Sequence, residues 1–256
     1  MTRTVADAAL MMSVLSLPDA RDHMSLPYQP TEWLQLERDL KGIRIGLWLD
    51  PGNGVPVDPE VREAVLKAAR AFGDAGAVVQ PIQSWIKPGM MEGTGRFFCV
   101  RIRETLAAMP ESERDKVTAV VRRATESTAN LTGSEVYHAH AQTIALRAAT
   151  WAATRDFDYI LSPVFPMPAF KVETIHSEQR DFHPALIGSF TAVFNYSEQP
   201  AASVNCGYTA SGLPIGLQIA GRRFDDLGVL QMAKAWEAMR PAQRPWPQLP
   251  RDGSPA

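Results

Sequence analysis

The stretch from Phe190 to Asp226 constrains the fold of this chain more than any other. It contains an N-x-x-x-Q-P turn that ends at Pro200, an apolar segment, a glycine-containing loop and a second apolar segment. Short apolar runs bounded by Gly and Pro are typical of buried strands. We therefore predict strands at 199–207 and 212–221, either as a β-hairpin or as another neighbouring pair.

Strand patterns alternate with helix patterns along the rest of the chain. Strands are predicted near 43–49, 77–80 and 157–162, and helices near 4–15, 59–72, 88–133, 134–151 and 226–239. Asp58-Pro59 is a helix-start signal, because Asp accepts hydrogen bonds from the first backbone amides and proline suits the first helical position. The alternation predicts α/β architecture.

One long helix is predicted to start at a Ser134 cap. Its apolar residues recur at helical spacing: Tyr137, Ala141, Ile144, Ala148 and Trp151. Because aromatic residues at this spacing usually bury area, we expect Trp151, like Trp236 and Trp246, to serve packing. His138 and His140 lie two residues apart and point in different directions on a helix, so we predict no metal site there.

Charge and composition exclude several classes of function. The 26 basic and 28 acidic residues are well mixed, which argues against a nucleic-acid footprint. No apolar run approaches the roughly 18 residues of a membrane span. Cys99 and Cys206 are the only cysteines, and two reduced cysteines are typical of a cytoplasmic protein. Neither a G-x-G-x-x-G motif nor a P-loop is present, so we predict no cofactor.

The order of these segments resembles the amidase signature family, serine hydrolases that cleave carboxamide C–N bonds. The likeness includes Phe190–Asp226, the strand Phe157–Pro163 with the prolines after it, and Met1–Ala9, which resembles the helix that follows the family's catalytic region. It implies a mixed β-sheet flanked by helices, amidase-signature-like but incomplete. We expect a single domain over residues 1–256, with a Pro-rich tail at 241–256.

The resemblance implies a Ser nucleophile, a second Ser with a cis peptide bond, and a Lys base. A hydroxyl needs a neighbouring base to become nucleophilic, and a Gly-rich loop offers amides to the oxyanion. The family places these groups upstream of the helix that begins at Thr4, and none of the six lysines precedes a Ser/Gly-rich loop. We therefore predict no catalytic residue here. We interpret the chain as the C-terminal portion of an amidase, with Met1 as an internal methionine.

The resemblance also bears on the substrate pocket. In the A subunits of tRNA-dependent amidotransferases, an Asp three residues before the Thr that matches Thr191 grips the amino group of glutamine. Gly188 stands at that position, so the resemblance does not favour a glutamine site. We expect Ile187, Gly188, Ser189 and Phe194 to form a smaller, more apolar lining for a small-molecule amide in the full-length form.

Two functions remain open. The chain is either part of an amidase, inactive alone, that needs an N-terminal half-chain or a second copy of itself, or a non-catalytic partner or scaffold subunit derived from an amidase. Both predict a sheet edge and an apolar surface that another polypeptide would cover.

Overall fold

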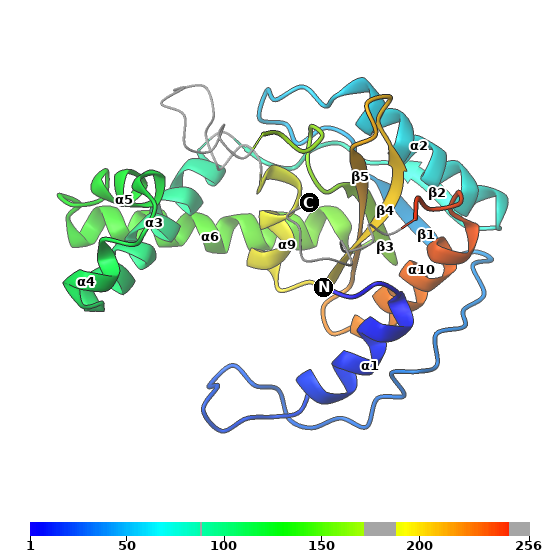
Figure 1. Cartoon of the computed structure of the whole chain (residues 1–256), viewed down its shortest axis with the longest axis horizontal. Coiled ribbons are helices and arrows are strands. Elements are labelled where there is room, and N and C mark those ends of the chain that lie inside the picture. The colour runs from blue at the N-terminus through cyan, green and yellow to red at the C-terminus, as the bar shows by residue number, and fades with distance from the viewer. Residues whose placement is uncertain (88, 172–187, 246–256) are drawn as a thin grey trace, which may run out of the picture.

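A five-stranded mixed sheet forms the centre of the molecule (Figure 1). The computed structural model describes residues 1–87, 89–171 and 188–245. The strands, in the order in which they pair, are β2 (Val78–Pro81), β1 (Arg44–Leu47), β3 (Tyr159–Pro163), β5 (Pro214–Gly221) and β4 (Ala201–Tyr208). The pairs β1–β2 and β1–β3 are parallel, whereas β3–β5 and β4–β5 are antiparallel. The predicted α/β class, mixed sheet and hairpin are therefore confirmed.

Helices flank the sheet and extend beyond it. They are α1 (Val5–Leu15), α2 (Pro59–Asp74), α3 (Met90–Ala108), α4 (Glu111–Arg114), α5 (Ala119–Glu126), α6 (Gly133–Thr154), α9 (Ala192–Ser197) and α10 (Asp226–Met239), with a 3₁₀ turn η1 at Gly188–Phe190. Asp58 caps α2 as predicted, because its Oδ1 accepts from the amide of Glu60 at 2.8 Å. Thr4 and Asp7 form the capping box of α1.

Side chains alternate between the two faces of the sheet, and each face has its own core. One core packs α1, α2 and α10 against residues such as Leu161 and Ile219. The other packs Trp48 and Ile160 against Phe190 of η1 and Phe194 of α9, together with residues of α6. In Figure 1, α2 and α10 accordingly lie on one side of the strands and α9 and α6 on the other.

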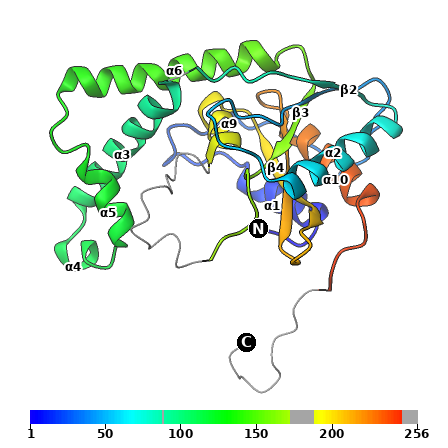
Figure 2. The same cartoon turned by 90° about the horizontal axis from the view of Figure 1, so that it is seen from above.

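A helical arm projects away from the sheet (Figures 1 and 2). It consists of α3, α4, α5 and the first half of α6, and α3 packs along α6. This agrees with the helical pattern predicted for 88–133.

Two details of α6 differ from prediction. The helix begins earlier than expected, because Thr132 and not Ser134 caps it and forms a capping box with Glu135. Trp151 does not pack inside, since 59% of it is exposed. Trp236 is buried as expected, and Trp246 lies outside the described residues.

Within the described ranges, no helix combines the length and apolar character that crossing a bilayer requires.

Candidate functional site

The loops after β1 and β3 leave the sheet at the same end, because the two strands are parallel. β5 starts at this end too, since Leu217 pairs with Pro163 in antiparallel register. In α/β sheets, ligands bind in the crevice outside the carboxyl ends of the strands. This end of the sheet is therefore where a site is expected.

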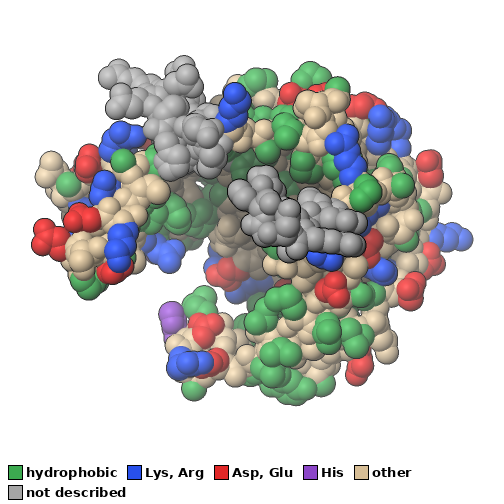
Figure 3. All heavy atoms as spheres, viewed as in Figure 1, with side chains coloured by type: hydrophobic (Ala, Val, Ile, Leu, Met, Phe, Trp, Pro, Cys, Tyr) green, Lys and Arg blue, Asp and Glu red, His purple; other side chains and the backbone are tan. Residues whose placement is uncertain are grey.

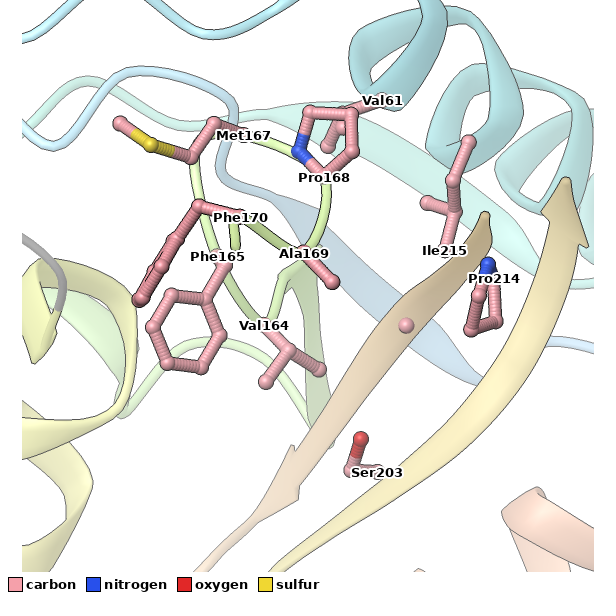
Figure 4. A pocket seen from close by; sticks show the side chains of 11 residues that line it. Val61, Val164, Phe165, Met167, Pro168, Ala169, Phe170, Ser203, Pro214 and Ile215 are labelled. Carbon is pink, nitrogen blue, oxygen red and sulfur yellow. The ribbon is translucent and has the colours of Figure 1, made fainter. Parts of the chain in front are cut away.

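An apolar pocket of about 330 Å³ opens between the loop after β3, the first residues of β5 and helix α2 (Figure 4). Its lining residues are Val61, Val164, Phe165, Met167, Pro168, Ala169, Phe170, Ser203, Pro214, Ile215 and Gly216. Among these described residues, Ser203 contributes the one side-chain hydroxyl and no side chain is ionisable. In Figure 4, Phe165 and Phe170 lie on one side of the pocket, while Pro214 and Ile215 lie on the other.

Two backbone hydrogen bonds fix the loop that forms this wall. The amide of Val164 donates to the carbonyl of Gly216 at 3.1 Å, and the amide of Asp58 donates to the carbonyl of Pro166 at 2.7 Å. The second bond ties the loop to the residue that caps α2. The wall is thus positioned by both the sheet and a helix start.

Gly216 permits the close approach of strand and loop. A Cβ at this position would lie 2.8 Å from Cγ2 of Val164 and 3.3 Å from Oγ of Ser203. Contacts that short force neighbouring atoms to move. The glycine therefore sets the floor of the pocket.

A buried polar network lies beside the pocket. Nε2 of Gln218 donates to Oγ of Ser162 at 2.9 Å and to the carbonyl of Phe190 at 2.8 Å. All three residues are at least 96% buried, so these bonds satisfy groups that have little access to water. The network joins β5, β3 and η1, and it fixes the segment that leads into α9.

The predicted pocket residues lie beside this network. Ile187 lies outside the described residues, and Gly188 opens η1. Ser189 is fully buried and accepts a hydrogen bond from Nδ2 of Asn53. Phe194 is 1% exposed, and its ring centroid is 6.2 Å from that of Trp48. None of the three described residues lines the apolar pocket, so their contact with a substrate stays a prediction.

Sequence reasoning did not nominate the loop at 164–170 as pocket lining. A signal was present, because Pro163, Pro166 and Pro168 follow an apolar strand and keep the chain from continuing it. What the sequence could not show is that this loop meets the start of β5, about fifty residues later in the chain.

The described residues do not assemble a serine nucleophile with a base. The lysines at 41, 67, 87, 116 and 171 are exposed, and Nζ of Lys234 bonds Oε2 of Glu237 at 2.9 Å. No hydrogen bond joins a serine hydroxyl to a lysine or histidine side chain in these ranges, and no cis peptide bond occurs in them. The same ranges hold no cluster of three potential metal ligands.

Comparison with known proteins identifies relatives of this arrangement. A family model described as Amidase matches residues 1–230. An acylamidase of Rhodococcus erythropolis is 31% identical over 257 residues, which cover 94% of this chain and 51% of that protein. The A subunit of the glutamyl-tRNA(Gln) amidotransferase of Myxococcus xanthus (strain DK1622) is 31% identical over 268 residues, covering 93% and 53%.

Solved structures agree with the sequence matches. A bacterial aryl acylamidase of the amidase signature enzymes superposes with a TM-score of 0.80 at 26% identity, over 93% of this chain and 52% of that one. A 6-aminohexanoate cyclic dimer hydrolase shares the fold with a TM-score of 0.82 at 20% identity, over 94% and 54%. The chain thus spans about half the length of the curated relatives it matches.

Proposed function

The chain belongs to the amidase signature family, and from this premise we propose that it is part of an enzyme that hydrolyses carboxamide C–N bonds. In this proposal it supplies the wall that holds an apolar substituent of the amide. The observation that carries the proposal is the apolar pocket beyond the carboxyl end of β3, in whose described lining Ser203 supplies the one side-chain hydroxyl.

The chemistry of the lining favours an uncharged, apolar group. Each buried methylene of a ligand contributes about 0.8 kcal/mol through the hydrophobic effect. A free ammonium, such as that of glutamine, would lose its hydration there without gaining a carboxylate partner from the lining. Aliphatic and aryl amides therefore fit the pocket better than glutamine does.

We also propose that these residues do not catalyse without further residues. Hydrolysis through an acyl-enzyme needs a hydroxyl activated by a base and amides directed at the oxyanion. Ser162 is 1% exposed and bonded to Gln218, and the lysines of the described ranges form no hydrogen bond with a serine hydroxyl. These observations support the proposal that the described part of the chain lacks an activated serine and its lysine base.

Two uncovered surfaces support a partner that supplies those groups. Helix α1 is apolar on nearly all sides, yet only Val5 and Ala9 are buried, and Leu10, Val14 and Leu15 are each more than half exposed. Figure 3 shows hydrophobic side chains gathered over this helix. Strand β4 is an edge of the described sheet, where no further strand of the described residues pairs with it. We propose that a further amidase segment, in the same polypeptide or a separate one, covers both.

The proposal is tested with the purified 256-residue chain and a panel of aliphatic and aryl amides. We expect no release of amine or ammonia, but saturable calorimetric binding of an aryl amide such as acetanilide. Phe165→Asp should abolish the binding, because it places a carboxylate in the lining, while 40% exposure of Phe165 spares the core. Leu213→Asp is the matched control, since Leu213 is 38% exposed and outside the lining.

Each result has a fixed meaning. Turnover by this chain alone would contradict the proposed lack of a catalytic group. Binding that survives Phe165→Asp would contradict the assignment of the pocket.

The exposed face of α1 also favours the second candidate, a non-catalytic scaffold that binds another amidase segment. Co-expression with the remaining segment of the Rhodococcus acylamidase separates the two. Turnover by the complex supports an enzyme part, whereas a stable complex without turnover supports a scaffold.

A further inference from the structure

Helix α6 carries its larger apolar side chains on its outward face. Tyr137, Ile144 and Trp151 are 69%, 56% and 59% exposed. Its buried positions are mostly smaller or hydroxyl-bearing: Ala139, Thr143, Leu146, Thr150 and Thr154. A helix that packs only against its own domain shows the reverse pattern. The outward face therefore has the composition of an interface.

The inward face of α6 already packs against α3 and α9, and its hydroxyl groups bond within the helix itself. The threonine hydroxyls bond backward along the helix; Thr150, for example, donates to the carbonyl of Leu146 at 2.8 Å, and Thr154 to that of Thr150 at 2.9 Å. In Figure 2, α6 runs along the upper border of the molecule, with the sheet and α9 below it. The face that carries Tyr137, Ile144 and Trp151 is thus open to solvent.

The apolar residues on the outward face of α6 form a stripe that has the spacing of a coiled-coil seam. Its residues follow at alternating intervals of four and three, with large and small side chains in turn: Tyr137, Ala141, Ile144, Ala148 and Trp151. Such 4-3 spacing lets two helices pack along their length, and large side chains of one helix need small ones opposite.

We propose that this face of α6 binds the same face of a second copy of the chain, with the two helices antiparallel. A twofold axis between residues 144 and 148 sets Ile144 over Ala148 of the second copy, and Trp151 over its Ala141. Each large side chain then meets an alanine. A contact of this kind is isologous and closes as a dimer.

The charges fit this register. From Tyr137 to Trp151 the one residue with a permanent charge is Arg147, which bonds both carboxylate oxygens of Glu198 at 2.8 and 3.0 Å. Arg147 lies one residue from the axis, and its bonds to Glu198, the residue that ends α9, hold its charge toward α9 and its own carboxylate partner. At the helix end, Arg155 already lies over the ring of Trp151, 5.4 Å from its centroid, and the register brings it to Tyr137 of the second copy. A guanidinium beside an aromatic ring is favourable.

Sedimentation velocity over a range of protein concentrations tests the proposal. Because one helix pair is a small interface, we expect a reversible monomer–dimer equilibrium rather than a permanent dimer. Ile144→Glu should abolish the dimer, since it places two carboxylates near the axis, and the 56% exposure of Ile144 spares the fold. Leu10→Glu makes the same change on α1, where Leu10 is 58% exposed, and should leave the dimer intact. Circular dichroism confirms folding of each variant.

Cross-linking tests the orientation. A mixture of Ile144→Cys and Ala148→Cys chains should form the mixed disulfide faster than either variant links to itself, with wild type as the control for Cys99 and Cys206. A parallel pair would favour the self-linked products and overturn the register. A monomer at every concentration, a dimer that survives Ile144→Glu, or one that Leu10→Glu abolishes would overturn the proposal. None of these measurements uses activity, so the outcome is independent of the proposed amidase function.

Discussion

Tyr159 donates its phenolic hydroxyl to Oδ2 of Asp225 at 2.6 Å, across 66 residues of sequence. Tyr159 lies in β3 and is 1% exposed, and Asp225 caps α10 by accepting from the amide of Gly228 at 3.2 Å. Burial and the hydrogen bond to Asp225 hold the pKa of Tyr159 well above its usual range. The bond therefore joins the central strand to the start of the last helix.

Tyr159→Phe should lower the free energy of unfolding by about 1–3 kcal/mol, because it removes the donor to Oδ2 of Asp225 and leaves that carboxylate with the amide of Gly228 alone. Urea denaturation followed by circular dichroism measures the change. Tyr208→Phe is the matched control, since the hydroxyl of Tyr208 makes only long hydrogen bonds, to Oε1 of Gln243 at 3.4 Å and from the amide of Arg244 at 3.3 Å. Equal losses in the two variants would contradict a special role for the Tyr159–Asp225 bond.

Gly216→Ala should reduce both stability and ligand binding. The added Cβ would meet Val164 at 2.8 Å, and overpacking of this kind costs about 1–3 kcal/mol. Gly73→Ala is the opposite case, because the new Cβ in α2 would have no neighbour within 4 Å. It should raise stability by up to about 1 kcal/mol through better helix propensity. Thermal melts and calorimetry of both variants check the contrast; a Gly216→Ala chain that binds amides unchanged would show that the pocket floor lies elsewhere.

Gln218→Leu should destabilise the chain by about 1–3 kcal/mol, because it leaves the buried carbonyl of Phe190 and the hydroxyl of Ser162 without their donor. Gln231→Leu removes two surface hydrogen bonds, one to the carbonyl of Gln35 and one from Arg38, and should cost less than about 0.5 kcal/mol. Urea denaturation of the two variants provides the comparison. The network has no stabilising role if the two midpoints shift alike.

The sequence predicted the bounds of the helices better than it predicted which side of a helix is buried. The Asp58-Pro59 start of α2 and the Asp226–Met239 bounds of α10 were readable because caps and helical periodicity act over a few neighbouring residues. The same periodicity in α6 did not reveal which side faces solvent, so Trp151 was wrongly expected inside. Helical periodicity indicates which residues share one face of a helix. Only tertiary packing decides whether that face points toward the core or toward solvent.

The candidate site was harder to predict because it is built from distant segments. The pocket joins Val61 of α2 to Phe165 and Ile215, residues that no local pattern connects. The polar network likewise depends on the pairing of β3 with β5, which places Ser162 opposite Gln218. Strand order follows from long-range contacts that spacing alone does not specify.

The thiol of Cys206 provides a pH-dependent test of burial on β4. Loss of hydration on burial raises its pKa from 9.0 to about 12, and Cys206 is 5% exposed. Between these values the unfolded chain releases the proton while the folded chain keeps it. The stability contributed by this group is therefore complete below pH 9.0 and is lost as the pH rises toward about 12.

We expect the free energy of unfolding to fall with pH in this range, and to fall less steeply in Cys206→Ala. Tyr159, whose pKa is also raised, contributes to the slope of both proteins, so the difference between the slopes isolates the thiol. In the native chain an alkylating reagent should modify the half-buried Cys99 before Cys206, because the thiolate is the reactive species and access is greater at Cys99. Faster modification of Cys206, or equal slopes in the two proteins, would mean that the inner face of β4 is open to solvent.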